Sequence, residues 1–412
     1  MIRIIVAHPG QQHSFRTATA LKRTGMLYKY MTTVYDRKGS MTSWILPFLS
    51  SKDLTKAKRR RCEALADTDV IQYLELPALL TIFFSHFPKL HKLKDWWNLQ
   101  VARRFNKKVI RYAIDNNVDG IIVYDGTAKR YLDTLASNTI TVMDVSIAVR
   151  PWIRHVYEQD MERFGHKDFY EEDPTLWNDY IIGDIRSDLS HCKYFLAASS
   201  VVKESLIYCG IKPSQIKILP YGVDIEQFSP IEHIGNTEGL NMIFVGQINR
   251  RKGLHHLLKC VRELNGKVNL FLVGGINPAS DLYKEYRNDN NITFTGFIDK
   301  TKLKEYYAMA DVFVLPSLAE GMSLAGLEAM AFGMPILCSD HSGINDLVEN
   351  GVNGYVFKTG DIDEMKNRIC WFVDNKDKCC LMGKRSREIA IEHTWERYNT
   401  DFEKIIKEII NQ

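Results

Sequence analysis

The chain has 412 residues, a formal net charge of +4, 45% hydrophobic residues and 25% charged residues. This composition is typical of a globular protein and excludes a disordered or fibrous chain, and the length predicts two domains. No apolar run reaches the roughly 20 residues that a membrane-spanning helix needs. The eight cysteines have no paired metal-ligand spacing, so we expect reduced thiols in a cytoplasmic protein.

In chain order, short apolar runs alternate with longer amphipathic segments. The start, MIRIIVAHPG, predicts a buried first strand rather than a signal peptide. The runs that predict strands are Ile2–Ala7, Gly120–Tyr124, Thr139–Met143, Lys193–Ala197, Asn241–Val245, Val268–Val273, Ile292–Thr295, Asp311–Leu315 and Pro335–Cys338. The segments with helical spacing include Arg103–Asn116, Val201–Cys209, Gly253–Leu264, Leu303–Met309 and Trp395–Ile410.

This alternation predicts parallel sheets that are covered by helices on both faces, because the strands are almost continuously apolar. The pattern occurs twice, so we expect an α/β protein with two doubly wound domains. Proline and glycine punctuate the stretch LPYGVDIEQFSP at residues 219–230, which marks the break between them. We predict a first domain over residues 1–218 and a second domain over residues 219–394.

The stretch AEGMSLAGLEAMAFGMP at residues 319–335 predicts the start of a helix, because apolar residues follow Ser323 at helical spacing. The first N–H groups of a helix attract anions such as phosphate. Glu320 nevertheless stands just before this helix and Glu328 stands inside it. Their carboxylates would repel a lone phosphate, but they would accept strong hydrogen bonds from hydroxyl groups.

A ligand with both a diphosphate and several hydroxyl groups satisfies this pattern, and a nucleotide sugar is such a ligand. We expect the backbone N–H groups of Gly321, Met322, Ser323 and Leu324 to hold the phosphate. One glutamate would accept hydrogen bonds from the sugar and the other from the ribose.

Several further motifs accompany this stretch. They are PYGVD at 220–224 with Phe228, FVGQINRRKG at 244–253, Gly296-Phe297, ADVFVLPS at 310–317, Gly343 and GVNG at 351–354. Together with the E-x7-E spacing they resemble retaining glycosyltransferases of family 4, also called glycosyl transferases group 1. The resemblance is nearly continuous from about residue 190 to 395. It is thinner before that, where His8-Pro9-Gly10 and Asp144–Ala148 stand in place of the family's acceptor-side loops.

The resemblance implies a GT-B fold, in which two Rossmann-like domains face each other across a cleft. The first domain would bind the acceptor and the second the nucleotide sugar, and the helix at 395–412 would pack back on the first domain. It also implies a UDP- or GDP-linked sugar as co-substrate, retention of the anomeric configuration, and neither a resident cofactor nor a metal ion.

The resemblance assigns roles to single residues. Lys252, with Arg251 or Arg250 beside it, would contact the diphosphate and balance the carboxylates. Glu320 would bind donor-sugar hydroxyls close to the anomeric carbon, and Glu328 would bind the ribose. The predicted catalytic residues are therefore Glu320, Lys252 and Arg251.

Other residues complete the predicted donor site. The backbone around Gly296 and Phe297 would meet the base. Gly246 belongs to the first loop of the donor domain, and Gly10 would let the first-domain backbone approach the phosphate closely, because a side chain there would obstruct it.

The chain departs from the family pattern at two positions. Gln247 stands where the family often has an arginine, so phosphate neutralisation falls on Lys252 and the arginines beside it. Val149 stands where many members have a histidine near the reacting centre, and His155 is the nearest substitute in sequence. These departures leave the acceptor-side catalytic residue open.

Three motifs have plainer interpretations. His8 and His13 are more often satisfied loop histidines than catalytic groups. Asp361-Ile362-Asp363 resembles a DxD metal motif, but it follows a glycine and precedes a helix. We therefore interpret Asp361 as a helix cap and expect no metal there.

A basic and aromatic region extends from Lys52 to Arg111. Its cationic residues are Lys52, Lys56, Lys58, Arg59, Arg60, Arg61, Lys89, Lys92, Lys94, Arg103, Arg104, Lys107 and Lys108, and between them lie Leu79–Phe84, Trp96 and Trp97. Cations beside apolar side chains suit an anionic membrane surface or a pyrophosphate-linked lipid acceptor. A solvated helical face over an ordinary core is an equally good interpretation. We do not expect nucleic-acid binding, because no recognised module accompanies the charge.

The predicted function is a glycosyltransferase that moves a sugar from a nucleotide sugar to a saccharide or lipid-linked acceptor, in cell-surface polysaccharide or glycolipid biosynthesis. We expect it in the cytoplasm, with peripheral contact to the inner face of the cell membrane. The alternatives are a sugar-nucleotide epimerase or hydrolase and a non-catalytic GT-B partner subunit. A nicotinamide-dependent dehydrogenase is excluded, because HPGQQH follows the first strand in place of GxGxxG.

Overall fold

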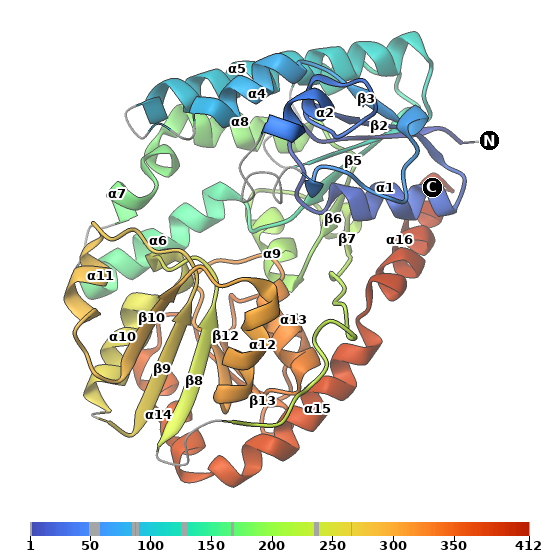
Figure 1. Ribbon diagram of the computed structural model, residues 1–412. Coiled ribbons are helices and arrows are strands. Elements are labelled where there is room, and N and C mark those ends of the chain that lie inside the picture. The colour runs from blue at the N-terminus through green and yellow to red at the C-terminus, as the bar shows by residue number, and fades with distance from the viewer. Residues whose placement is uncertain are drawn as a thin grey trace.

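The computed structural model describes residues 2–48, 58–84, 87, 90–124, 130–165, 169–234, 239–264 and 266–411 (Figure 1). The strands form two separate sheets, of seven and six strands, and the pairings between neighbouring strands are parallel. Helices cover both sheets. The expectation of an α/β protein with two doubly wound parallel sheets is therefore confirmed.

The first sheet has the strand order β3-β2-β1-β4-β5-β6-β7. Its strands are β1 (Ile4–Ala7), β2 (Leu27–Thr32), β3 (Val70–Gln72), β4 (Gly120–Tyr124), β5 (Ile140–Val145), β6 (Tyr194–Ala197) and β7 (Ile216–Ile218). The helices in this part of the chain are α1 (Ser14–Arg23), α2 (Met41–Ile45), α4 (Glu75–Phe84), α5 (His91–Asp115), α6 (Arg150–Phe164), α7 (Phe169–Glu172), α8 (Asp179–Ser190) and α9 (Ser200–Tyr208). The order reverses at β1, whose neighbours are β2 and β4; ligands of open parallel sheets bind at such a point, beyond the carboxyl ends of the strands.

The second sheet has the strand order β10-β9-β8-β11-β12-β13. Its strands are β8 (Leu240–Val245), β9 (Val268–Val273), β10 (Ile292–Gly296), β11 (Val312–Leu315), β12 (Ile336–Ser339) and β13 (Gly354–Phe357). The helices are α10 (Leu254–Glu263), α11 (Asp281–Tyr286), α12 (Lys300–Met309), α13 (Leu324–Phe332), α14 (Ile362–Asp374), α15 (Cys379–Glu392) and α16 (Trp395–Ile410). Here the order reverses between β8 and β11, so that loops after these strands meet at one edge.

The predicted strands all occur, with ends shifted by at most two residues. The sequence missed β2, β3, β7 and β13. Two of them, β3 and β7, have only three residues each, and β2 has Lys29 among its apolar residues and ends at the polar Thr32. Helix α5 is longer than predicted, because its first half does not show the regular apolar spacing that the search relied on.

The last helix, α16, contacts the first helix, α1. The side chain of Tyr398 shares a hydrogen bond of 3.3 Å with Thr17, and Arg23 forms an ion pair of 2.6 Å with Glu396. In Figure 1 the red α16 runs from the second sheet to the side of the blue α1. The predicted boundary between residues 218 and 219 lies between β7 and β8, the last strand of one sheet and the first strand of the other. The boundaries themselves stay predictions.

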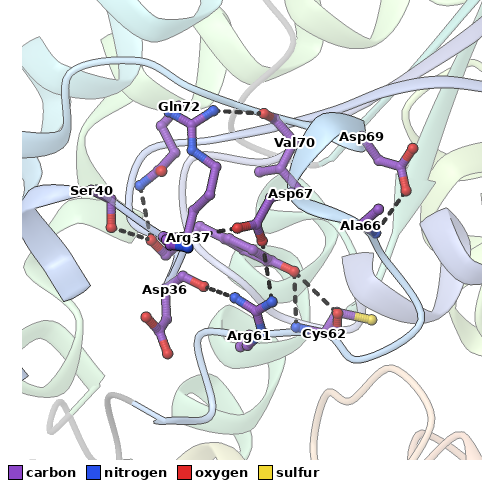
Figure 2. A network of polar contacts seen from close by, with 12 residues as sticks. Asp36, Arg37, Ser40, Arg61, Cys62, Ala66, Asp67, Asp69, Val70 and Gln72 are labelled. Atoms are coloured by element: carbon purple, nitrogen blue, oxygen red, sulfur yellow. Dashed lines mark hydrogen bonds and ion pairs between the residues drawn. The ribbon is translucent and has the colours of Figure 1, made fainter.

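A network of polar contacts holds β3 and the segment before it against the loop after β2 (Figure 2). Arg61 donates to the carbonyl of Asp36 at 2.6 Å and forms an ion pair with Asp67 at 3.2 Å. Arg37 donates to the carbonyl of Val70 at 3.3 Å. These contacts join a short edge strand and the segment before it to the rest of the first sheet.

Candidate donor site between the two sheets

Glu320 lies in the loop between β11 and α13, at the N-terminus of that helix. Ser323 caps α13, because its side chain accepts a hydrogen bond of 3.1 Å from the backbone N–H of Gly326. The loop also touches the first half of the chain, since Ala148 donates its backbone N–H to the carbonyl of Glu320 at 3.3 Å. The residue before Ala148, Ile147, forms an antiparallel bridge with Gly321. The two halves of the chain therefore meet at the residue that we predicted to bind the sugar.

Only glycine fits at position 321. A Cβ there would overlap the carbonyl oxygen of Ser146. A second contact closes the same loop, because the Ser199 hydroxyl donates to the carbonyl of Gly321 at 2.8 Å. The backbone after Glu320 is consequently held between the loop after β5 and the start of α9.

The Glu320 carboxylate contacts two cations from the loop that follows β8. The ammonium of Lys252 forms an ion pair with it, and Nη1 of Arg251 lies 3.3 Å from each of its oxygens. Lys252 is buried. Burial lowers the pKa of the Lys252 ammonium well below its ordinary value, and the neighbouring Arg251 guanidinium lowers it further. The contacting Glu320 carboxylate opposes that effect, because it favours the charged form of the lysine.

The loop after β8 is shaped by a cap and a glycine. The Asn249 side chain accepts a hydrogen bond of 3.2 Å from the backbone N–H of Lys252, which closes a single helical turn. Gly253 then has φ of +66°, and a Cβ at this position would overlap the carbonyl oxygen of Pro316. Leu318 donates its N–H to the Arg251 carbonyl at 2.9 Å. These contacts bring Arg251 and Lys252 against the segment that carries Glu320.

A hollow of about 1020 Å³ lies beside these residues, and we call it the interdomain hollow. The first half of the chain lines it with Tyr157, Glu172 and Asp173, and the second half with Gln247, Ile248, Asn249, Arg250, Arg251, Gly275, Ile276, Asn277, Ala279, Ser280, Asp281 and Lys284. Two of these lining residues, Arg250 and Glu172, form an ion pair of 3.2 Å between the two halves of the chain. The lining is rich in hydrogen-bonding and charged groups, which suits a polar ligand such as a diphosphate or a sugar.

The base-binding segment that we predicted around Gly296 and Phe297 adjoins the loop after β8. Gly274 donates its N–H to the Gly296 carbonyl at 2.9 Å, and a Cβ at Gly274 would overlap the carbonyl oxygen of Gly246. The Phe297 side chain is 81% exposed. Gly246, Gly274 and Gly296 thus form one row of close backbone contacts at the ends of β8, β9 and β10.

Two predicted residues make other contacts. Glu328 is half-buried on α13, two turns beyond Glu320, and its negative charge adds to the effect of burial in raising the pKa of Tyr307. Gly10 belongs to the loop after β1, where its N–H donates to Nδ1 of His8 at 2.8 Å. Of the predicted site residues, Lys252 and Arg251 contact Glu320 directly, whereas Glu328 and Gly10 have the interactions just described.

Several charged and aromatic groups of this region were not found from the sequence. His341 follows β12, and its Nδ1 lies 3.0 Å from the Leu318 carbonyl while its ring packs 4.7 Å from Trp152. Glu172 and Tyr157 come from α7 and α6. No local sequence signal marks them, because they reach the interdomain hollow only when the two halves of the chain pack together.

The histidine that we considered as an acceptor-side substitute packs elsewhere. The His155 ring stacks on Tyr208 of α9 at 5.2 Å and lies 3.2 Å from the Gln159 amide. Val149 is the N-cap residue of α6 and donates its N–H to the Ser205 hydroxyl at 3.1 Å. Neither position places an acid or base beside Glu320.

His13 forms a buried hydrogen-bonded group that joins three parts of the chain. Its Nε2 lies 2.8 Å from Asp144 at the end of β5, and its Nδ1 lies 3.1 Å from the hydroxyl of Tyr221 in the linker. Thr17 also donates to Asp144, at 3.3 Å. Both ring nitrogens of His13 therefore have partners, as the interpretation of a satisfied histidine requires. Asp361 likewise caps α14, accepting from the Glu364 N–H at 2.9 Å, so the capping interpretation is confirmed.

An exposed apolar surface lies over α4 and α5, and we call it the α4–α5 surface. Its large exposed side chains are Leu76, Ile82, Phe83, Phe87, Leu93, Trp96 and Leu99. Trp97 holds the two helices together by donating its indole N–H to the Pro77 carbonyl at 2.8 Å. In Figure 1 these helices lie along the top of the first sheet, far from the second sheet.

Cationic residues continue along α5 from the α4–α5 surface. Arg104, Lys107, Lys108 and Arg111 are exposed. Of the other cations that we predicted for this region, Lys52, Lys56 and Lys89 lie outside the described residues, as does the side chain of Lys92. Within the described residues, no helix is both long and apolar enough to cross a membrane.

A family model described as "Glycosyl transferases group 1" matches residues 228–389, which cover the second sheet. One similar curated protein is the "Putative colanic acid biosynthesis glycosyltransferase WcaL" of Escherichia coli strain K12, 30% identical over 201 residues, 46% of this chain and 49% of that protein. Another is the "UDP-Gal:alpha-D-GlcNAc-diphosphoundecaprenol alpha-1,3-galactosyltransferase" of Escherichia coli, 31% identical over 184 residues, 40% of this chain and 47% of that protein. The chain thus spans about half the length of the curated relatives it matches.

Among solved structures, the chain is similar to Anabaena Alr3699/HepE in complex with UDP and glucose. The TM-score is 0.63 at 15% sequence identity, and the match covers 99% of this chain and 100% of that one. At this identity the similarity concerns the fold alone. Together with the two parallel sheets, it confirms the GT-B fold that the sequence resemblance implied.

Proposed function

We propose that the protein is a glycosyltransferase, because residues 228–389 match the family model described as "Glycosyl transferases group 1". It moves a sugar from a nucleotide sugar to a saccharide or lipid-linked acceptor, with retention of the anomeric configuration. The reaction serves the synthesis of a cell-surface polysaccharide or glycolipid.

One observation carries this proposal: the Glu320 carboxylate meets Lys252 and Arg251 at the N-terminus of α13, between the two halves of the chain. The two cations and the helix N-terminus can stabilise a departing diphosphate. The carboxylate can accept hydrogen bonds from the sugar and lies where positive charge develops at the anomeric carbon. The cations that can bind the diphosphate thus lie next to the carboxylate that can bind the sugar, and a nucleotide sugar needs both.

The proposed donor is a UDP- or GDP-linked sugar. The interdomain hollow has room and polar lining for such a molecule, and the similar Anabaena protein was crystallised with UDP and glucose. We place the diphosphate at Lys252 and Arg251, the sugar at Glu320, the ribose at Glu328 and the base beside Phe297.

The proposed acceptor is a lipid-linked saccharide at an anionic membrane surface on the cytoplasmic side. The α4–α5 surface supports this, because apolar and aromatic side chains stand beside the exposed cations of α5. The name of the Escherichia coli galactosyltransferase specifies a diphosphoundecaprenol acceptor. All eight cysteines are free thiols, which suits a reducing compartment.

A thermal-shift screen against nucleotide sugars and free nucleotides tests the donor site, with the wild type and Glu328→Ala compared. A donor at a hundred times its dissociation constant should stabilise the wild type by about 2.7 kcal/mol. We expect a shift for one donor, reduced in the variant. Equal shifts in the two proteins would remove the ribose role of Glu328, and no shift with any nucleotide would contradict the proposal.

A non-catalytic partner subunit is the second candidate, because Val149 provides no acid or base at the acceptor side. Radiolabelled donor and lipid extracts of the host distinguish the two. Transfer of label to lipid supports the enzyme, whereas donor binding without label transfer or donor hydrolysis supports the subunit. Label released as free sugar in the absence of lipid would indicate a hydrolase.

Co-sedimentation with vesicles tests the membrane surface. The wild type should sediment with vesicles that contain anionic lipids, and a double variant with Phe83→Ser and Trp96→Ser should stay in solution. The control is Leu381→Ser on α15, which removes another exposed apolar side chain and should behave as the wild type. Equal retention of the two variants would contradict the α4–α5 surface as the contact.

A further inference from the structure

Three potential metal ligands converge between the two halves of the chain. Asp160 lies near the end of α6, and His255 and His256 are consecutive residues in the first turn of α10. One carboxylate oxygen lies 3.0 Å from Nε2 of His255 and the other 2.7 Å from Nε2 of His256. All the ligand atoms lie within 4.8 Å of one another. We propose that these residues form a Zn²⁺ site that links α6 to α10.

The ligand chemistry fits zinc. Imidazole nitrogen and carboxylate oxygen bind Zn²⁺ at about 2.0–2.2 Å. In a tetrahedral site, two ligand atoms at that radius lie about 3.4 Å apart. The observed separations of 2.7 and 3.0 Å are slightly shorter, so a shift of a few tenths of an ångström admits the ion. A water or an acceptor from a neighbouring residue completes four-coordination.

All three side chains are shielded from solvent. Asp160 and His256 are buried, and the side chain of His255 is 13% exposed. The three ligand groups therefore face one another inside the protein, where a bound cation would replace the two hydrogen bonds between the histidines and the carboxylate.

Apolar rings enclose the site on the side of the first half of the chain. Phe164 packs 4.5 Å from the His256 ring, and Phe169 packs 5.8 Å from the His255 ring. Gly360 adds to the enclosure, since a Cβ at that position would lie 3.7 Å from the Asp160 carboxylate. A dry shell of this kind strengthens electrostatic binding of a cation and fixes the orientation of its ligands.

The position gives the ion a structural role. Helix α10 begins directly after Gly253, so its first turn is continuous with the loop that carries Arg251 and Lys252. Helix α6 belongs to the first half of the chain, and Figure 1 shows it beside α10. A bound Zn²⁺ would hold this loop to the first half without contacting the reacting sugar. The inference is independent of the proposed function, since it needs no donor or acceptor.

The alternative is that both histidines only donate hydrogen bonds to Asp160. A zinc titration distinguishes this alternative from the proposed site. Chelator-treated protein is titrated with ZnCl₂ alone, and a chromogenic chelator competes with the protein for the zinc. The test is made in a Cys380→Ser background, because the exposed Cys380 could bind zinc itself. The variants are His255→Gln and Asp160→Asn, and the control is His233→Gln, whose half-exposed side chain contacts Asp311 at 3.3 Å instead of Asp160.

We expect one tight zinc site per chain, weakened on the order of 100-fold in both variants and unchanged in the control. Co²⁺ should give the intense visible absorption of a four-coordinate site, and His255→Gln should lose it. Melting curves in chelator show whether the variants fold. If a variant does not fold, two measurements on the wild type still test the site. They are the Co²⁺ spectrum and a rise in melting temperature when zinc is added. Absence of tight zinc binding to the wild type, or equal binding by His255→Gln, would overturn the site.

Discussion

Lys252 forms an ion pair with Glu320, although the two residues come from loops that follow different strands, β8 and β11. These strands are neighbours in the second sheet. The pair therefore depends on strand order, and it combines the two charges that the proposed reaction needs: a cation for the diphosphate and a carboxylate for the sugar.

Replacing Lys252 with methionine should lower kcat/KM for the donor by about 10²–10³, because one preorganised charge opposite the leaving diphosphate is lost. Lys259→Met is the matched control, since Lys259 is exposed on the same helix that follows the loop. Initial rates of nucleotide diphosphate release measure the effect. A loss of less than about fivefold in Lys252→Met would assign the charge stabilisation to other groups.

Replacing Glu328 with alanine should raise KM for the donor by about 10-fold or more, because a charged hydrogen bond to ribose contributes about 1.5–3 kcal/mol. The value of kcat should change little, since the ribose is remote from the reacting bond. Glu392→Ala, exposed on α15, is the control. A fall in kcat with unchanged KM would place Glu328 at the reacting centre instead.

Alanine substitutions at two glycines with left-handed backbone distinguish the cost of backbone strain from the cost of a steric overlap. Gly266 has φ of +81°, and a Cβ added there would meet no atom within 4 Å, so Gly266→Ala should cost about 1–2 kcal/mol of unfolding free energy. Gly253→Ala should cost more than about 3 kcal/mol, because its Cβ would also overlap the Pro316 carbonyl. Urea unfolding curves measure both, and equal costs would contradict the close approach of the two loops.

His8 should make the protein less stable in acid. Burial lowers the pKa of His8 from 6.5 to about 4, so the unfolded chain binds a proton between these values that the native protein does not. Stability therefore rises with pH from about 4 to 6.5, by about 3 kcal/mol from this residue at 1.36 kcal/mol per pKa unit.

Urea unfolding at pH 4.5 and 7 tests this effect in the wild type and in His8→Gln. The variant should lose less stability in acid than the wild type. His155→Gln, whose ring contacts Gln159 of its own helix, is the control. The same acid loss in His8→Gln and in the wild type would show that other groups cause it.

The alternation of apolar runs was enough to predict two parallel sheets, because strands buried on both faces must be apolar whatever their neighbours. Runs such as Val268–Val273 carry this information locally. Strands β3 and β7 were missed, since three residues at a sheet edge need little apolar surface. Helix α16 was placed correctly from its single apolar stripe.

The sequence by itself determined the two parallel sheets and the resemblance of residues 228–389 to the glycosyl transferases group 1 model. It also determined the helix start after Glu320, because caps, strand burial and motif spacing are local properties. The tertiary structure alone decided that Lys252 and Arg251 meet Glu320, that Gly321 must approach Ser146, and that Asp160 meets two histidines of α10. These contacts join residues far apart in the chain, and they form only when strand order and the packing of the two halves bring separate loops together.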